Sequence, residues 1–144
     1  MEHHGSCLCK KVQFTIKEAE PTVSACHCSM CRQWTSGPLL SIDAGNSQNI
    51  LFSGTEEIGR YQSSEWAERG FCKNCGSSLF YYGIEDDSYY IPIDLLDTVD
   101  QAQLTLEIMY DNKPSYYSFS NETEKMTAAQ VYQQFVEETT AIDE

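Results

Sequence analysis

The chain has 144 residues, of which 41% are hydrophobic and 12% aromatic, so it can form one globular domain with a sizeable core. Its formal net charge of −13 disfavours nucleic acid and anionic membranes as partners. No apolar run approaches the roughly 20 residues that a membrane-spanning helix needs, so we expect no membrane partner of that kind.

The acidic residues are concentrated in the C-terminal part of the chain. Residues 85–144 hold 14 of the 22 acids but two of the nine bases, whereas the part with all seven cysteines is nearly neutral. The N-terminal sequence Met1-Glu2-His3-His4-Gly5 has no apolar core, so we expect no signal peptide. We therefore expect a cytoplasmic location, where reducing conditions keep thiols available for metal binding.

Alternating apolar and polar residues predict short strands along most of the chain. Val12, Phe14 and Ile16, for example, alternate with polar residues shortly after Cys9. The predicted strands span residues 12–16, 22–25, 39–42, 50–52, 57–62, 67–71, 79–82, 89–93, 104–108 and 116–119. This pattern predicts a mainly β protein that forms a single domain over residues 1–144.

Two helical segments are expected among these strands. Ser29 can cap a helical turn that runs through Trp34, and this turn would orient Cys28 and Cys31. A capping-box pattern at residues 127–130 is followed by apolar residues at helical spacing. It predicts an amphipathic C-terminal helix over about residues 127–138.

The cysteines occur in three short-spaced groups. The central group is Cys26-His27-Cys28-Ser29-Met30-Cys31-Arg32, and the flanking groups are Cys7-Leu8-Cys9 and Cys72-Lys73-Asn74-Cys75-Gly76. Such groups are typical of metal sites. Disulfides are disfavoured by the odd number of cysteines and by the expected compartment, and the usual spacings of iron–sulfur proteins are absent. Zinc is the preferred interpretation.

Seven thiols divide naturally into four and three. Cys72-x-x-Cys75-Gly76 has the form of a zinc knuckle, in which Gly76 can take the left-handed conformation that the turn needs. With Cys7 and Cys9 it would complete a closed structural zinc site. Cys26, Cys28 and Cys31 would then form a second site with three ligands and one vacancy, as catalytic zinc sites have.

An alternative is that a fourth protein ligand closes the second site. His27 is nearest in the sequence, but it lies between two ligands and is expected to point away from them. His3, His4 and the acidic residues are the other candidates. The spacing alone leaves the open and closed arrangements as competing interpretations, with the open one preferred.

The sequence resembles the family of glutathione-dependent formaldehyde-activating enzymes, which includes the centromere protein V group. The matching segments cover most of residues 5–120. They are Gly5-Ser6-Cys7-Leu8-Cys9, the segment from Cys26 to Arg32 with Ser36-Gly37, Arg69-Gly70-Phe71 with Cys72 to Gly76, and Lys113-Pro114-Ser115-Tyr116-Tyr117. Two positions depart from the family pattern, because Lys10 replaces a frequent glycine and Glu107 a frequent histidine.

The resemblance implies a fold, two zinc ions per chain and a set of ligands. The fold would be the β-tent, with two small antiparallel sheets folded over zinc, a core at about residues 5–120 and the C-terminal helix added to it. The resemblance places the structural zinc on Cys7, Cys9, Cys72 and Cys75. It places the second, catalytic zinc on the three remaining cysteines, Cys26, Cys28 and Cys31.

The resemblance also implies an activity. The namesake reaction joins glutathione and formaldehyde into S-(hydroxymethyl)glutathione, which makes the enzyme a carbon–sulfur lyase in the reverse sense. A glutathione-like thiol and a small aldehyde would be the partners, and the oligomeric state stays unknown. The competing interpretation is a non-enzymatic, zinc-stabilised scaffold or protein-binding domain of the same fold.

Five of the nine bases lie within four residues of a cysteine, namely Lys10, Lys11, Arg32, Arg69 and Lys73. They could form a basic rim that attracts an anionic thiol such as glutathione. The alternative is that they balance the negative charge of a four-thiolate zinc site. We prefer charge balance as the interpretation.

Overall fold

The computed structural model describes residues 1–143, with side chains described through residue 137. The chain forms two compact units. Unit 1 consists of Met1–Val23 and Ser41–Gln103, and unit 2 consists of Ser24–Leu40 and the chain from Leu104 on. The single zinc-binding domain expected for residues 1–144 stays a prediction.

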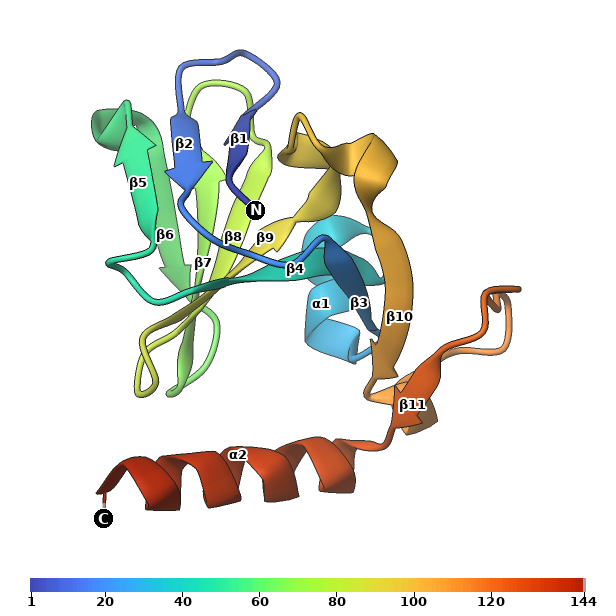
Figure 1. Ribbon diagram of the computed structural model, residues 1–144. Coiled ribbons are helices and arrows are strands. Elements are labelled where there is room, and N and C mark those ends of the chain that lie inside the picture. The colour runs from blue at the N-terminus through green and yellow to red at the C-terminus, as the bar shows by residue number, and fades with distance from the viewer. Residues whose placement is uncertain (144) are drawn as a thin grey trace. The chain divides into compact units, whose positions relative to one another are not determined.

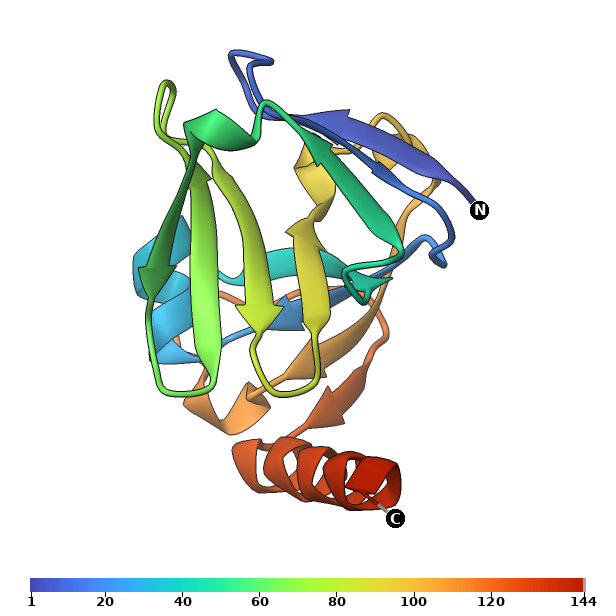
Figure 2. The same cartoon turned by 90° about the vertical axis from the view of Figure 1, so that its left-hand side faces the viewer.

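Unit 1 contains a three-stranded antiparallel sheet and most strands of a larger sheet (Figures 1 and 2). The small sheet has the order β1-β2-β5, with β1 at His3–Ser6, β2 at Gln13–Ile16 and β5 at Ile50–Ser53. The larger sheet contributes neighbours in the order β4-β9-β8-β7-β6, all antiparallel. These strands span Leu39–Gly45 (β4), Ile58–Gln62 (β6), Ala67–Cys72 (β7), Ser78–Gly83 (β8) and Ser88–Pro92 (β9). Short 3-10 helices lie at Thr55–Glu57, Ile93–Leu95 and Val99–Gln101.

Unit 2 combines strands with both α-helices. Helix α1 spans Ser29–Thr35 and follows β3, which spans Thr22–Cys26 and begins in unit 1. Strand β10 (Gln103–Ile108) is followed by a 3-10 helix at Tyr110–Asn112, β11 (Glu124–Met126) and α2 (Ala128–Asp143). Strands β10 and β11 are parallel, with Leu106 opposite Glu124.

An aromatic cluster between the two sheets forms the core of unit 1. Phe14 of β2 lies 5.9 Å from Phe52 of β5, and Phe52 lies 5.6 Å from Phe80 of β8, measured between ring centroids. Phe80 in turn meets Tyr89 of β9 edge-on at 5.2 Å. Strands β2 and β9 alternate between buried and exposed or half-buried residues, whereas in β8 the consecutive residues Leu79 and Phe80 are both buried. The expected period-2 pattern therefore accounts for the rings of Phe14 and Tyr89 in this core.

The predicted β class is confirmed, but three details differ. The larger sheet has eight strands and includes one parallel pair, so it is not a small antiparallel sheet. Strand β1 was not predicted, because His3–Ser6 has no apolar alternation. The predicted strand at residues 116–119 is wrong, and the strand of this region is β11 instead.

The segment after residue 112 folds around a lysine and not as a strand. The Nζ atom of Lys113 donates to the carbonyl of Pro114 at 3.1 Å, to that of Tyr117 at 2.5 Å and to the hydroxyl of Ser118 at 3.2 Å. The ammonium group of Lys113 thus donates to carbonyl groups that, in a strand, would accept from the amides of a neighbouring strand. Alternation of apolar residues could not reveal this arrangement.

The C-terminal helix and its capping box are confirmed. The Thr127 hydroxyl accepts from the Gln130 amide at 3.2 Å, and the Gln130 side-chain oxygen accepts from the Thr127 amide at 2.8 Å. Helix α2 continues to Asp143, beyond the expected end near residue 138.

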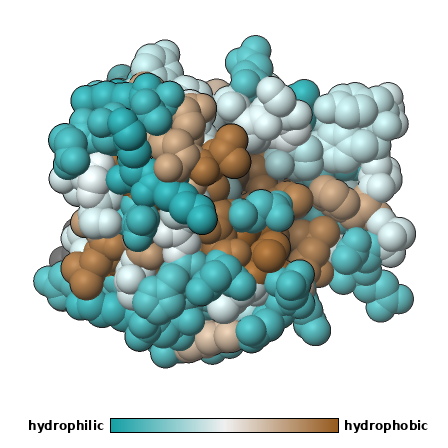
Figure 3. Space-filling view, turned by 90° about the horizontal axis from the view of Figure 1, so that it is seen from above, coloured by the Kyte–Doolittle hydropathy of each residue, from teal (hydrophilic) through white to brown (hydrophobic). Residues whose placement is uncertain are grey.

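Among the described residues, no helix is both long enough and apolar enough to cross a membrane. On the face drawn in Figure 3, apolar side chains gather near the middle and hydrophilic side chains surround them.

Replacing Gly70 with alanine should destabilise the protein by about 1–3 kcal/mol, because the new methyl group has no room. Gly70 is buried in β7, and an added Cβ would lie 2.2 Å from the ring of Phe80. Gly37→Ala is the matched control, since nothing lies within 4 Å of its added Cβ. Chemical denaturation would measure both variants, and equal stabilities would contradict this packing.

Candidate functional site

The structure brings Cys7, Cys9, Cys72 and Cys75 together in unit 1. Their Sγ atoms all lie within 4.8 Å of one another, and the four residues come from two distant segments of the chain. The Sγ atom of Cys9 lies 3.6 Å from that of Cys7 and 3.7 Å from that of Cys72. Because a disulfide bond measures about 2.05 Å, these contacts are not disulfides. Four thiols at this spacing could hold a metal ion.

Backbone amides point at the sulfurs of this cluster. The Cys7 sulfur accepts from the amide of Val12 at 3.4 Å, and the Cys72 sulfur accepts from that of Cys75 at 3.5 Å. Gly76 has a φ of 81°, so the left-handed turn predicted for the knuckle is confirmed. Such donors stabilise negative charge on sulfur, which suits metal-bound thiolates.

Burial and local hydrogen bonds shift the pKa of three thiols in this cluster. The amide of Cys75 acts to lower the pKa of Cys72, but burial and the neighbouring thiols raise it to about 11. The hydroxyl and amide of Ser77 lower the pKa of Cys75 to about 5. The side chain of Asn74 lowers the pKa of Cys9. Metal binding requires deprotonated thiols, so the donor set fits a cation such as zinc.

The second group, Cys26, Cys28 and Cys31, lies entirely within unit 2. The three Sγ atoms lie within 4.8 Å of one another, and those of Cys26 and Cys28 are 3.5 Å apart. The thiols of Cys28 and Cys31, together with burial, raise the pKa of Cys26 strongly. Three thiols this close do not ionise together without a nearby cation, so this donor set also fits a metal ion.

Helix α1 orients two of these three cysteines, as expected, but its cap differs from the prediction. Cys28 occupies the N-cap position in place of Ser29, and its sulfur accepts from the amide of Cys31 at 3.4 Å. A cysteine can take this role because its sulfur is a weak acceptor. The cap therefore fixes the spacing of Cys28 and Cys31 directly.

None of the three histidines joins the second cysteine group among the described residues. His3 is buried, and its ring nitrogens contact Thr98 and the carbonyl of Ala19. The His4 ring contacts Thr15 at 3.1 Å and Glu2 at 2.8 Å. No described carboxylate joins the group either.

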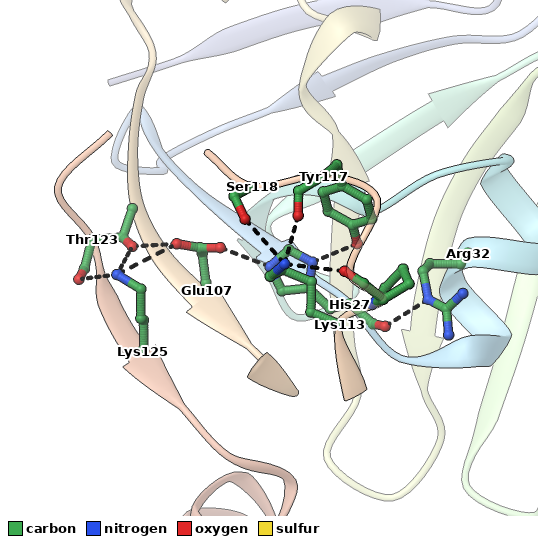
Figure 4. A network of polar contacts seen from close by, with 9 residues as sticks. His27, Arg32, Glu107, Lys113, Tyr117, Ser118, Thr123 and Lys125 are labelled. Atoms are coloured by element: carbon green, nitrogen blue, oxygen red, sulfur yellow. Dashed lines mark hydrogen bonds and ion pairs between the residues drawn. The ribbon is translucent and has the colours of Figure 1, made fainter. Parts of the chain in front are cut away.

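His27 points into a buried polar network of unit 2 (Figure 4). Its Nε2 atom lies 2.8 Å from Oε1 of Glu107, and its Nδ1 atom lies 2.7 Å from the hydroxyl of Tyr117. The other oxygen of Glu107 accepts from Thr123 and lies 3.8 Å from the ammonium of Lys125. The sequence predicts that His27 points away from the ligands, but no pattern in it identifies Glu107 as the partner of His27.

The ionisation of Glu107 follows from its neighbours. Burial acts to raise its pKa, but hydrogen bonds from Thr123 and His27 lower it more, so the pKa lies below the usual value. The carboxylate can only accept, so we assign a proton to Nε2 of His27. Nδ1 lies against the Tyr117 hydroxyl, and burial raises the pKa of that hydroxyl.

The five bases near the cysteines have different environments. Arg69 is buried and lies over the ring of Tyr81 at 5.0 Å. Arg32 is half-buried, and its Nε atom donates to the carbonyl of His27 at 2.9 Å. Lys10, Lys11 and Lys73 are exposed. Of the five bases, one is therefore buried, one is half-buried and three are exposed.

Unit 1 also has two shallow hollows, of about 360 Å³ and 260 Å³. The larger is lined by polar loop residues such as Asn46 and Asn49, and the smaller by residues of the three-stranded sheet such as Phe14 and Leu51. No cysteine lines either hollow.

The chain is similar to known proteins over most of its length. The model of the family "glutathione-dependent formaldehyde-activating enzyme" matches residues 2–112. An uncharacterized lyase of Schizosaccharomyces pombe is 35% identical over 136 residues, which are 94% of this chain and 98% of that protein. The crystal structure of a Rhodobacter sphaeroides protein superposes with a TM-score of 0.58 at 22% identity, covering 70% of this chain and 96% of that one.

The structural similarity supports the fold. The family match covers the two cysteine groups and β10, and the relative is similar along nearly the whole chain. On these grounds the chain belongs to the family of glutathione-dependent formaldehyde-activating enzymes.

Proposed function

We propose that the protein is a zinc-dependent carbon–sulfur lyase that resembles S-(hydroxymethyl)glutathione synthase. It would join a glutathione-like thiol to a small aldehyde such as formaldehyde. The observation that carries the proposal is the group of three thiols, Cys26, Cys28 and Cys31, which no fourth described ligand joins. In a member of this family, such a group suits a metal ion that keeps one position for substrate.

The two cysteine groups would have different roles. Cys7, Cys9, Cys72 and Cys75 would hold a structural zinc that links β1 and its turn to the end of β7. The three remaining cysteines would hold a second zinc, which gives two per chain. A zinc ion in the second group would lower the pKa of a thiol bound to it, so that the thiolate forms at neutral pH.

The reaction itself needs few groups from the protein. The sulfur of glutathione attacks the carbonyl carbon of the aldehyde and forms the carbon–sulfur bond. The electron pair of the carbonyl bond moves to oxygen, which takes up a proton and becomes the hydroxyl of the product. In the reverse direction the same bond breaks, which is the lyase reaction. Positioning the two reactants together would supply much of the rate enhancement.

Other parts of the proposal rest on composition. The net charge of −13 supports small molecules and not nucleic acid or an anionic membrane as partners. The short spacing of the seven cysteines, which is typical of metal sites, supports a reducing, cytoplasmic location.

The second candidate function is a zinc-stabilised scaffold or protein-binding domain without enzymatic activity. The amides that donate to the sulfurs of Cys7 and Cys72 suit a metal that stabilises the fold, and this alternative requires no more than such a metal. A scaffold would bind two zinc ions and would not bind glutathione, so the measurements below distinguish the two functions.

The purified protein should contain two zinc ions per chain, and Cys28→Ser should contain one while remaining folded. The loss is selective because Cys28 belongs to the three-cysteine group and caps a helix of seven residues. Cys72→Ser is the contrasting variant, because Cys72 is fully buried and its group joins two distant segments. We expect it to lose the structural zinc and most of its thermal stability.

Elemental analysis and thermal unfolding would measure these changes. One zinc in the wild type, or equal loss of stability in Cys28→Ser and Cys72→Ser, would contradict the division of roles.

Glutathione should bind the wild type and bind Cys28→Ser at least about tenfold more weakly, a loss of about 1.4 kcal/mol or more. The reason is that Cys28→Ser would lack the zinc ion of the three-cysteine group, to which the thiol of glutathione would bind. S-methylglutathione, which has no free thiol, is the control ligand and should bind the wild type as weakly as glutathione binds the variant. Calorimetric titration measures all three affinities, and equal binding of both ligands to the wild type would refute thiol coordination.

A further inference from the structure

The residue between Cys26 and Cys28 is held at every polar atom. The His27 amide donates to the carbonyl of Ile108 at 3.1 Å, and the His27 carbonyl accepts from Arg32 at 2.9 Å. Its two ring nitrogens meet Glu107 and Tyr117. His27 has no exposed surface, so water cannot replace any of these partners.

The position of His27 sets the positions of its two neighbours. Successive side chains of an extended segment point to opposite sides, so the side chains of Cys26 and Cys28 lie together on the side opposite to that of His27. Their sulfurs lie 3.5 Å apart, which agrees with this arrangement. A rotation of the His27 backbone would therefore move both sulfurs relative to each other.

Besides Arg32, Glu107 is the charged partner of His27. It is buried with 2% exposure, and hydrogen bonds to an ionised acceptor are about twice as strong as neutral ones. Thr123 and Lys125 hold the carboxylate from its other oxygen, as the dashed lines in Figure 4 show. Burying an ionised carboxylate is costly, and the hydrogen bonds from His27 and Thr123 offset part of this cost.

We propose that Glu107 is a positioning residue for the second cysteine group, because it holds the His27 ring and thereby fixes the spacing of the Cys26 and Cys28 thiols. The inference rests on the proposed function, in that it takes this group to bind a metal ion. In this proposal the hydrogen bond that Glu107 accepts from His27 is the essential feature, and the negative charge of Glu107 only strengthens that bond. An isosteric acceptor without charge should therefore preserve the site.

Cobalt(II) is the probe for this inference, because its thiolate absorption bands depend on the geometry of the sulfur ligands. The variant Glu107→Leu removes the acceptor, whereas Glu107→Gln keeps an oxygen at the same place. Glu124→Leu is the matched control, since Glu124 is an exposed acid on the neighbouring strand β11. Subtracting the spectrum of Cys28→Ser isolates the absorption of the three-cysteine group.

In Glu107→Leu we expect the three-cysteine group to bind cobalt about 10–100-fold more weakly and its absorption bands to shift. Losses of this size are typical when a residue that supports a metal ligand is replaced. Glu107→Gln should restore affinity to within about threefold, and Glu124→Leu should match the wild type. The bands of the four-cysteine group should not change. This selectivity separates a positioning role from a general loss of stability, which would affect both groups.

Unchanged affinity and bands in Glu107→Leu would overturn the inference, and so would equal losses in Glu107→Gln and Glu107→Leu. If Glu107→Leu does not fold, Thr123→Val provides the test, because it removes one support of the carboxylate. A selective loss of about threefold or more at the three-cysteine group is then expected, and no loss would refute the proposal. A wild type that binds one cobalt ion would instead refute the proposed function itself.

Discussion

Sulfur atoms held 3.5–3.7 Å apart repel one another once they ionise, and both cysteine groups of this protein have this spacing. Amide donors relieve part of the repulsion, but only a bound cation can compensate for three or four thiolates. Binding of a structural zinc contributes about 10–16 kcal/mol, which is comparable to the ~5–15 kcal/mol of a whole domain's stability. A metal at the four-cysteine group would therefore decide whether β1, its turn and the end of β7 stay together.

The division into four and three cysteines was predictable from the sequence, and the structure groups the residues in this way. Short spacings such as Cys72-x-x-Cys75 restrict the two side chains to one turn, so their proximity needs no knowledge of the fold. The strand pattern was predictable for similar reasons, because Phe14 and Tyr89 occupy buried positions that alternate with less buried positions along their strands. The capping box at Thr127 is likewise a local feature.

Features that depend on distant residues or on polar contacts could not be predicted. Glu107 lies 80 positions from His27, and no periodic pattern links the two residues. The loop that folds around Lys113 contains aromatic residues of the kind common in strands, Tyr116, Tyr117 and Phe119, but the ammonium group of Lys113 takes its carbonyl groups. Strand β1 contains two histidines and a glycine, so its pairing with β2 becomes visible only in the folded chain. The contact between Glu107 and His27 lies in unit 2, which also contains the second cysteine group.

X-ray absorption at the zinc edge of the purified protein tests the central claim most directly. One closed and one open site predict an average of about 3.5 sulfur neighbours per zinc, with the remainder an oxygen or nitrogen atom. Addition of glutathione should raise the average to about four sulfurs, because its thiol would occupy the remaining position. An average that stays unchanged when glutathione is added would contradict the account, as would four sulfur neighbours in the absence of glutathione.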